Sequence, residues 1–154
     1  MTTPSATLLN HAGIAARVPH AGAMCLLDTL QAWDADRIHC TAVSHVDLHH
    51  PLRTKHGLLA PVAIEYAGQA MALHAGLVAA PGSTPRAGFL ASARGLVCHV
   101  PRLDDTHAPL HIHAHNLLGD ARQAQYSFKL TDANGRGLVE GRATVVLAGV
   151  PGPA

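Results

Sequence analysis

Residues 60–79 have the sequence APVAIEYAGQAMALHAGLVA, which is the only long helical candidate in the chain. Pro61 suits the first turn of a helix, where a missing N–H costs little, and Pro81 with Gly82 ends the pattern. Many alanines and glycines leave room for other backbone to approach the helix closely. Three polar residues interrupt its apolar character: Glu65, Gln69 and His74. We therefore expect a buried helix of a water-soluble domain and no membrane span.

Strand patterns lie on both sides of this helix. Two strands are expected before it, at 24–33 and 37–46, and 47–57 is expected to be a loop. Four more are expected after it, at 89–100, 110–118, 121–131 and 137–148. Asn134-Gly135 is a strong hairpin signal between the last two.

One helix cannot cover a whole sheet face unless the sheet curls around it. The sequence therefore predicts an α+β fold, with an antiparallel sheet of five or six strands wrapped around one long central helix. We expect a single domain over 1–154, with its core at about 14–148 and a frayed tail at 149–154. Such a sheet leaves an edge that needs a partner.

Composition excludes several classes of function. The net charge of +1 offers no basic patch for nucleic acid. Three cysteines are too few and unpaired for a disulfide framework, and the N-terminal residues lack a signal-peptide pattern. These observations favour a cytoplasmic protein.

Four motifs carry a resemblance to a known family. They are VPHAGAMCLLD at 18–28, IEYAGQAMA at 64–72, GFLASAR at 88–94 and GRGLVEGRATVVL at 135–147. The first two resemble segments of the beta-hydroxyacyl-ACP dehydratases. All four, in this order, resemble a branch of 3-hydroxyacyl-ACP dehydratases from aryl-polyene and related polyketide pigment clusters. The resemblance spans about residues 14–148.

This resemblance implies a hot-dog fold and a thioester-binding tunnel at a dimer interface. It implies a substrate carried on the phosphopantetheine of acyl carrier protein, with no further cofactor. In such dehydratases a histidine ahead of the helix works with a carboxylate on the helix of the other subunit. The partner subunit is expected to be an identical chain or a homologous hot-dog chain.

Dehydration of a 3-hydroxyacyl thioester needs a base for the C2 proton, an acid for the leaving hydroxyl and polarisation of the carbonyl. Glu65 is the candidate carboxylate, because in so apolar a helix burial would raise its pKa. The alternative is that Glu65 faces solvent or caps a strand. Gln69, one turn further on, either orients Glu65 in the substrate site or bonds to the strand opposite.

His50, 15 residues before Glu65, is the candidate base, with His49 and His56 as alternatives. We also place His56 among the substrate-binding candidates. The loop departs from the His-Phe-Pro-Gly pattern of the familiar dehydratases. Ala60 replaces the glycine whose N–H would meet the thioester carbonyl. Ala60 still offers an N–H and is a substrate-binding candidate, whereas Pro61 has none.

Two other groups of side chains are notable. His111, His113 and His115 alternate, so on a strand they share one face. Neighbours on one face are about 6–7 Å apart, too far for one strand to close a zinc site. We therefore expect a solvated face and no metal. The basic residues that could help to dock an acidic carrier protein are Arg53, Lys55, Arg94 and Arg102.

The leading hypothesis is a dehydratase that converts 3-hydroxyacyl-ACP to trans-2-enoyl-ACP in polyketide or fatty-acid-type biosynthesis. One alternative is an acyl thioesterase on the same fold, with Glu65 activating water. A second is a catalytically silent subunit that completes a heterodimer with an active homologue, which the weak match in the loop before the helix favours.

Overall fold

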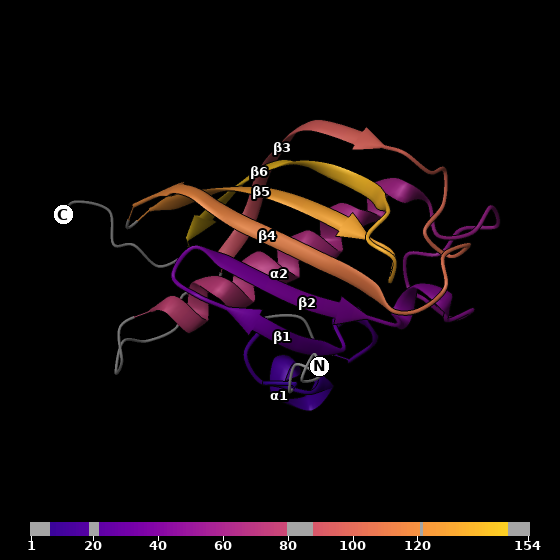
Figure 1. Cartoon of the computed structure of the whole chain (residues 1–154), viewed down its shortest axis with the longest axis horizontal. Helices are drawn as coiled ribbons and strands as arrows, with labels where there is room; N and C mark the ends of the chain where they lie inside the picture. Colours follow the sequence, from indigo (N-terminus) through magenta and orange to yellow (C-terminus); the bar gives the residue numbers. More distant parts are fainter. Residues whose placement is uncertain (1–6, 19–21, 80–87, 121, 148–154) are drawn as a thin grey trace.

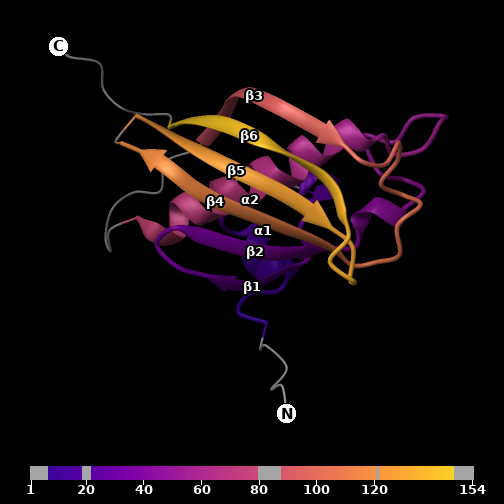
Figure 2. The same ribbon diagram turned by 45° about the horizontal axis from the view of Figure 1, so that its top comes forward.

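One long helix, α2, lies against a curled antiparallel sheet of six strands (Figures 1 and 2). The structure is a computed structural model and describes residues 7–18, 22–79, 88–120 and 122–147. The strand order is β1-β2-β4-β5-β6-β3, which places the first strand after the helix at the edge opposite β1. The helices are α1 (His11–Ala15) and α2 (Ala63–Val78), with 3-10 turns η1 (Gly22–Met24), η2 (Ser44–Val46) and η3 (Ala60–Val62). The strands are β1 (Thr29–Trp33), β2 (Arg37–Ala42), β3 (Gly88–Cys98), β4 (Leu110–Gly119), β5 (Gln123–Thr131) and β6 (Gly137–Leu147).

This arrangement confirms the predicted α+β hot-dog fold, including the four strands after the helix. The expected tail at 149–154 lies outside the described residues. The strand predicted at 24–33 was too long, because β1 starts only at Thr29. The backbone of residues 24–26 instead forms hydrogen bonds with the side chain of Gln69 on α2. The strand predicted at 37–46 ends at Ala42, and η2 follows it.

The core lies between α2 and the inner face of the sheet. Alternate residues of the strands point inward, among them Ile38, Ile112, Phe128 and Leu130. Facing them, α2 buries mostly small and aliphatic side chains, namely Ala63, Ala67, Ala70, Met71 and Leu73. Since only 3% of the residues are aromatic, this core depends on close packing of small groups.

Gln69 anchors the segment before β1 to the helix. Its Oε1 accepts the N–H of Leu26 at 2.8 Å, and its Nε2 donates to the carbonyl of Met24 at 2.6 Å. The side chain is fully buried, so both ends of the amide are used within the chain. Of the two roles expected for Gln69, the observed bonds match the one in which it joins α2 to the opposite segment.

Near the C-terminal end of α2, His74 joins the helix to the sheet by two hydrogen bonds. Its Nε2 donates to the carbonyl of Asp34 at 2.9 Å, and its Nδ1 accepts the hydroxyl of Tyr126 at 2.8 Å. Burial lowers the pKa of His74, which keeps the ring neutral. Both nitrogens are therefore satisfied, and this histidine is a structural element of the core.

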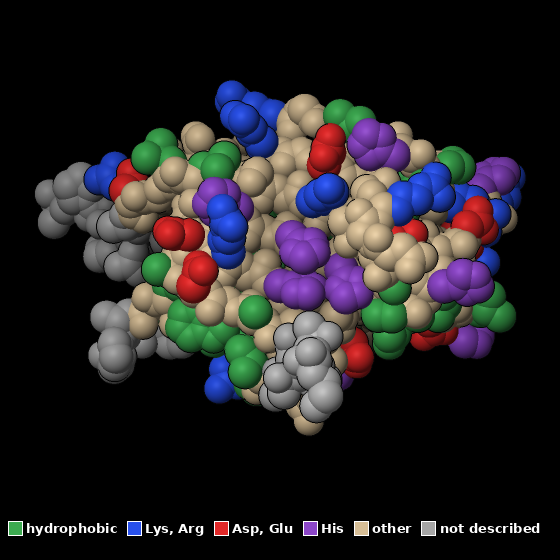
Figure 3. Space-filling view, viewed as in Figure 1, with side chains coloured by type: hydrophobic (Ala, Val, Ile, Leu, Met, Phe, Trp, Pro, Cys, Tyr) green, Lys and Arg blue, Asp and Glu red, His purple; other side chains and the backbone are tan. Residues whose placement is uncertain are grey.

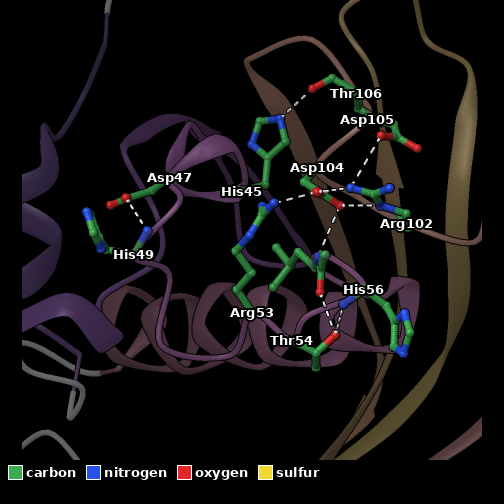
Figure 4. A network of polar contacts seen from close by, with 12 residues as sticks. His45, Asp47, His49, Arg53, Thr54, His56, Arg102, Asp104, Asp105 and Thr106 are labelled. Atoms are coloured by element: carbon green, nitrogen blue, oxygen red, sulfur yellow. Dashed lines mark hydrogen bonds and ion pairs between the residues drawn. The ribbon is translucent and has the colours of Figure 1, made fainter.

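Asp104 fastens the loop before α2 to the segment between β3 and β4 (Figure 4). Its carboxylate accepts from Arg53 at 3.1 Å, from the guanidinium of Arg102 and from the N–H of Leu58. The bonds to Arg102 hold the pKa of Asp104 at about 2, although its side chain is only 4% exposed. Gly57, at φ +97°, is required here because a Cβ would meet the Arg102 guanidinium at 2.6 Å.

β3 forms one free edge of the sheet within this chain. Of the described strands it pairs with β6 alone, and between Leu90 and Cys98 its side chains are exposed or half-buried. Leu90 and Val97 are among these exposed apolar residues. A long edge with apolar side chains is a surface on which another strand can pair.

Among the described residues, none of the helices has the length and apolar character needed to cross a membrane.

Replacing Gln69 by leucine should lower the free energy of unfolding by about 1–3 kcal/mol, because the buried N–H of Leu26 and the partly buried carbonyl of Met24 lose their partner. Urea denaturation measures this difference. The matched control is Gln125→Leu, which changes an exposed glutamine on β5. Equal stability of the two variants would show that the buried amide contributes nothing.

The pKa of Asp104 predicts acid sensitivity. Since it is held at about 2 in the folded chain and lies near its usual value of about 3.9 when unfolded, Asp104 contributes stability above pH 3.9 that is lost as the pH falls toward about 2. Asp104→Asn should remove about 2 kcal/mol at neutral pH and flatten this part of the pH profile. Denaturant unfolding between about pH 5 and pH 2 checks it.

Asp105→Asn is the control for Asp104. The Asp105 carboxylate lies 3.7 Å from Arg102, and its side chain is 65% exposed. The Asp105→Asn substitution should therefore change the free energy of unfolding by less than about 1 kcal/mol. An Asp104→Asn profile parallel to that of the wild type would contradict the assignment.

Candidate active site

His50 lies at the end of a chain of hydrogen bonds beside the start of α2. Its Nε2 is 3.1 Å from the hydroxyl of Tyr66, which is 2.8 Å from the Oγ of Ser44. Ser44 in turn donates to the carbonyl of Leu26 at 2.9 Å. The chain therefore links the loop, α2, η2 and the segment before β1.

The donor and acceptor in each of these bonds are fixed by the two ends of the chain of hydrogen bonds, His50 and the carbonyl of Leu26. The Nδ1 of His50 accepts the N–H of Leu52 at 3.0 Å, so in the neutral ring the proton is on Nε2. Nε2 then donates to Tyr66, Tyr66 donates to Ser44, and Ser44 donates to the carbonyl of Leu26. Both nitrogens of His50 are thus engaged within the chain.

Burial sets the ionisation of this group. It lowers the pKa of His50, with Asp47 opposing and Arg53 reinforcing the shift, and His50 is only 5% exposed. Burial also raises the pKa of Tyr66 to about 12. The neutral forms of both groups are therefore favoured at neutral pH.

Glu65 points away from this network. Adjacent residues on a helix diverge by about 100°, and whereas Tyr66 is buried, Glu65 is exposed. The expectation that the helix would bury this carboxylate was wrong for the single chain. Glu65 lies on an outer face of α2 with Gly68, Ala72 and Gly76, all exposed or half-buried.

No described residue packs over the glycines of this outer face of α2. A Cβ built at Gly68 or Gly76 would meet nothing within 4 Å. Because most side chains on this face are small, another helix could pack against it at a short interaxial distance. Among the described residues, Glu65 has no ion pair or hydrogen bond to another side chain.

The other histidine candidates differ from His50. His49 and His56 are exposed, and Figure 4 shows the His56 ring directed away from the Asp104 network. Sequence reasoning missed His45, which is completely buried in η2 and donates from Nε2 to the carbonyl of Thr106 at 2.9 Å. Its Nδ1 has no partner among the described residues. No spacing or motif marked it, because it fell at the end of an expected strand.

The expected carbonyl-binding donor is not free. The N–H of Ala60 donates to the carbonyl of Pro101 at 3.0 Å, because residues 58–60 pair with 101–103. The N–H of Val62 bonds to Leu59, and that of Ala63 bonds back to η3. Since Pro61 has none, the N–H groups from Ala60 to Ala63 offer no open donor for a thioester.

The basic candidates divide into two pairs. Arg53 and Arg102 are held by Asp104, which gives them a structural use. Lys55 and Arg94 are exposed, the first in the loop before α2 and the second on β3.

The sheet brings together another set of titratable groups. His39 of β2 meets His111 and His113 of β4 on the outer face, whereas His115 is outside the cluster. Figure 3 shows histidines gathered near the middle of this face. Burial, followed by the neighbouring His113 and His111, lowers the pKa of His39 to about 4.

Solved structures share this architecture. The dehydratase heterocomplex ApeI:P from Xenorhabdus doucetiae contains a chain 24% identical to this one, with a TM-score of 0.79, over 89% of this chain and 91% of that chain. AziG of S. sahachiroi is 19% identical with a TM-score of 0.60, over 79% and 90%. A thioesterase from Haemophilus influenzae is 12% identical with a TM-score of 0.66, over 97% and 98%. At these identities the likeness shows a common fold.

Comparison with curated proteins found no match. A family model, ApeP-like and described as ApeP dehydratase, matches residues 12–149 and so contains all four motifs identified in the sequence. This match confirms the resemblance to hot-dog dehydratases of the aryl-polyene branch. Because the match covers nearly the whole described chain, the protein belongs to the ApeP-like dehydratase family.

Proposed function

We propose that the chain is a subunit of a dimeric dehydratase that removes water from 3-hydroxyacyl thioesters carried on acyl carrier protein. The observation that supports this proposal most directly is the position of Glu65. It is an exposed carboxylate at the start of the central helix, on a face of small residues over whose glycines no described residue packs. Family membership supplies the reaction class.

The reaction requires two proton transfers. A base removes the C2 proton, the electron pair forms the C2–C3 double bond, and the C3–O bond breaks as an acid protonates the leaving hydroxyl. In this proposal Glu65 is the acid that releases water, and a histidine acts on C2.

The second subunit is proposed to pack on the outer face of α2 and along the β3 edge. Neither surface has a partner among the residues that the structure describes. The similar chain in ApeI:P comes from a heterocomplex, so the partner is either an identical chain or a homologous hot-dog subunit. Exposed Lys55 and Arg94 are available to attract an acidic carrier protein in a cytoplasmic setting.

A second candidate function is favoured by the state of His50. Both of its nitrogens are engaged, and the N–H groups at the start of the helix are used within the chain. In this version His50 is a structural residue, and the chain supplies only Glu65 to a site whose histidine comes from a homologous partner. The chain would then be half-active, in contrast to a fully silent subunit.

Glu65→Gln should lower kcat/KM for dehydration by about 10²–10⁴-fold, because the acid for the leaving hydroxyl is lost. Mass spectrometry of 3-hydroxyacyl-ACP detects the loss of one water. The assay is run on the chain alone and on its complex with a homologous hot-dog subunit from the same organism. The control is Glu140→Gln, since Glu140 is the only other glutamate and lies on β6.

Full activity of Glu65→Gln would remove Glu65 from the mechanism. Release of free acid by the wild type would identify a thioesterase. Unchanged substrate in both assays would contradict the proposed dehydratase function.

His50→Ala separates the two candidates. If each site combines His50 of one subunit with Glu65 of the other, His50→Ala and Glu65→Gln are each inactive as homodimers. Mixing them should restore about a quarter of the wild-type activity, because half of the dimers are mixed and each has one intact site of two. If His50 is structural, His50→Ala instead stays active in the heterocomplex. His49→Ala, at the exposed neighbour, is the control.

A further inference from the structure

Three imidazoles converge on the outer face of the sheet, on the side opposite α2. His39 comes from β2, and His111 and His113 come from β4. One ring nitrogen from each residue can be chosen so that all three lie within 4.8 Å of one another. The proposed dehydratase chemistry makes no use of this cluster, which is referred to below as the histidine triangle.

The strand register creates the histidine triangle. His39 is directly opposite His113 in the antiparallel pair, and His111 is the next residue of β4 on the same face. Directly opposed residues have Cβ atoms about 4.5–5.5 Å apart, and diagonal ones are within reach of long or aromatic side chains. One strand cannot close a site with alternate histidines, but the addition of His39 from the neighbouring strand closes it.

The distances are near those of a metal site. The Nε2 of His39 is 2.8 Å from the Nδ1 of His111, and the rings of His39 and His113 stack with centroids 4.3 Å apart. Zinc–nitrogen bonds of about 2.0–2.1 Å in a tetrahedron place ligand nitrogens about 3.3 Å apart. Small rotations of these partly exposed side chains are enough to reach that geometry.

An ion can reach the histidine triangle from solvent. His39 and His113 line an open groove of about 940 Å³ over the outer face of the sheet. Three protein ligands leave a fourth position for water or another ligand, as in open zinc sites. Lys129, opposite His113 on β5, is the cation nearest in register, and Glu140 lies opposite Lys129 on β6 to offset its charge.

We propose that His39, His111 and His113 together bind one divalent transition-metal ion of the zinc class. Three imidazoles and no carboxylate select zinc, cobalt, nickel or copper over magnesium and calcium, which prefer oxygen ligands. The bound ion would join β2 to β4 and stabilise the folded chain by linkage. This proposal is independent of the dehydratase function.

Titration of the chelator-treated, full-length protein with ZnCl₂ in a calorimeter tests the site. We expect one Zn²⁺ per chain, a higher melting temperature with Zn²⁺, and neither effect with Mg²⁺. Co²⁺ should give the visible d–d absorption of a tetrahedral nitrogen site. His39→Ala, His111→Ala and His113→Ala should each weaken Zn²⁺ binding by more than about 100-fold, since loss of even an outer-shell partner costs about 10–100-fold.

His115→Ala is the matched control, because His115 is on the same strand and face but outside the histidine triangle. It should bind Zn²⁺ like the wild type. Each triangle position is also changed to Asn, and melting in chelator shows whether a variant is folded. The proposal is overturned if the wild type does not bind one Zn²⁺ per chain, if folded triangle variants keep full affinity, or if His115→Ala loses as much.

Discussion

The need to satisfy three buried polar side chains on one helix constrains most of this structure. Tyr66, Gln69 and His74 lie on the buried side of α2, where an unpaired polar group costs about 1–3 kcal/mol. Their partners are in η2 and the loop before α2, in the segment before β1, and in the turn after β1 together with β5. The helix therefore fixes the loops around it through polar contacts, while packing of small side chains holds it against the sheet.

The same constraint divides the candidate catalytic groups. The bonds that position His50 also occupy both of its nitrogens, and they join it to the buried side of α2. Glu65 is one residue from Tyr66 but faces outward, because the helical turn separates adjacent side chains. A chain built in this way has its histidine directed inward and its carboxylate available to a neighbour. This division matches the proposed site, in which the histidine and the carboxylate come from different subunits.

The two faces of the sheet have different chemistry for a simple geometric reason. Alternation along β2 and β4 sends Ile38, Cys40, Ile112 and Ala114 to the core and histidines to the exterior. The register between β2 and β4 then decides which exterior residues meet. It places His39 beside His111 and His113, which are more than seventy positions later in the chain. The outer face consequently holds a convergent group of imidazoles on the side of the sheet opposite the helix.

The periodicity of the sequence determined the central helix, the four later strands and the wrapped α+β fold, because local propensity and turn residues act over short distances. The motifs also determined the family. Only the tertiary structure decided that residues 24–28 are not a strand, that the Ala60 N–H is used by Pro101, and that Glu65 is exposed while His45 is buried. It alone placed His39 beside His111. These features depend on which distant groups pair, and pairing across strands and loops leaves no local pattern in the chain.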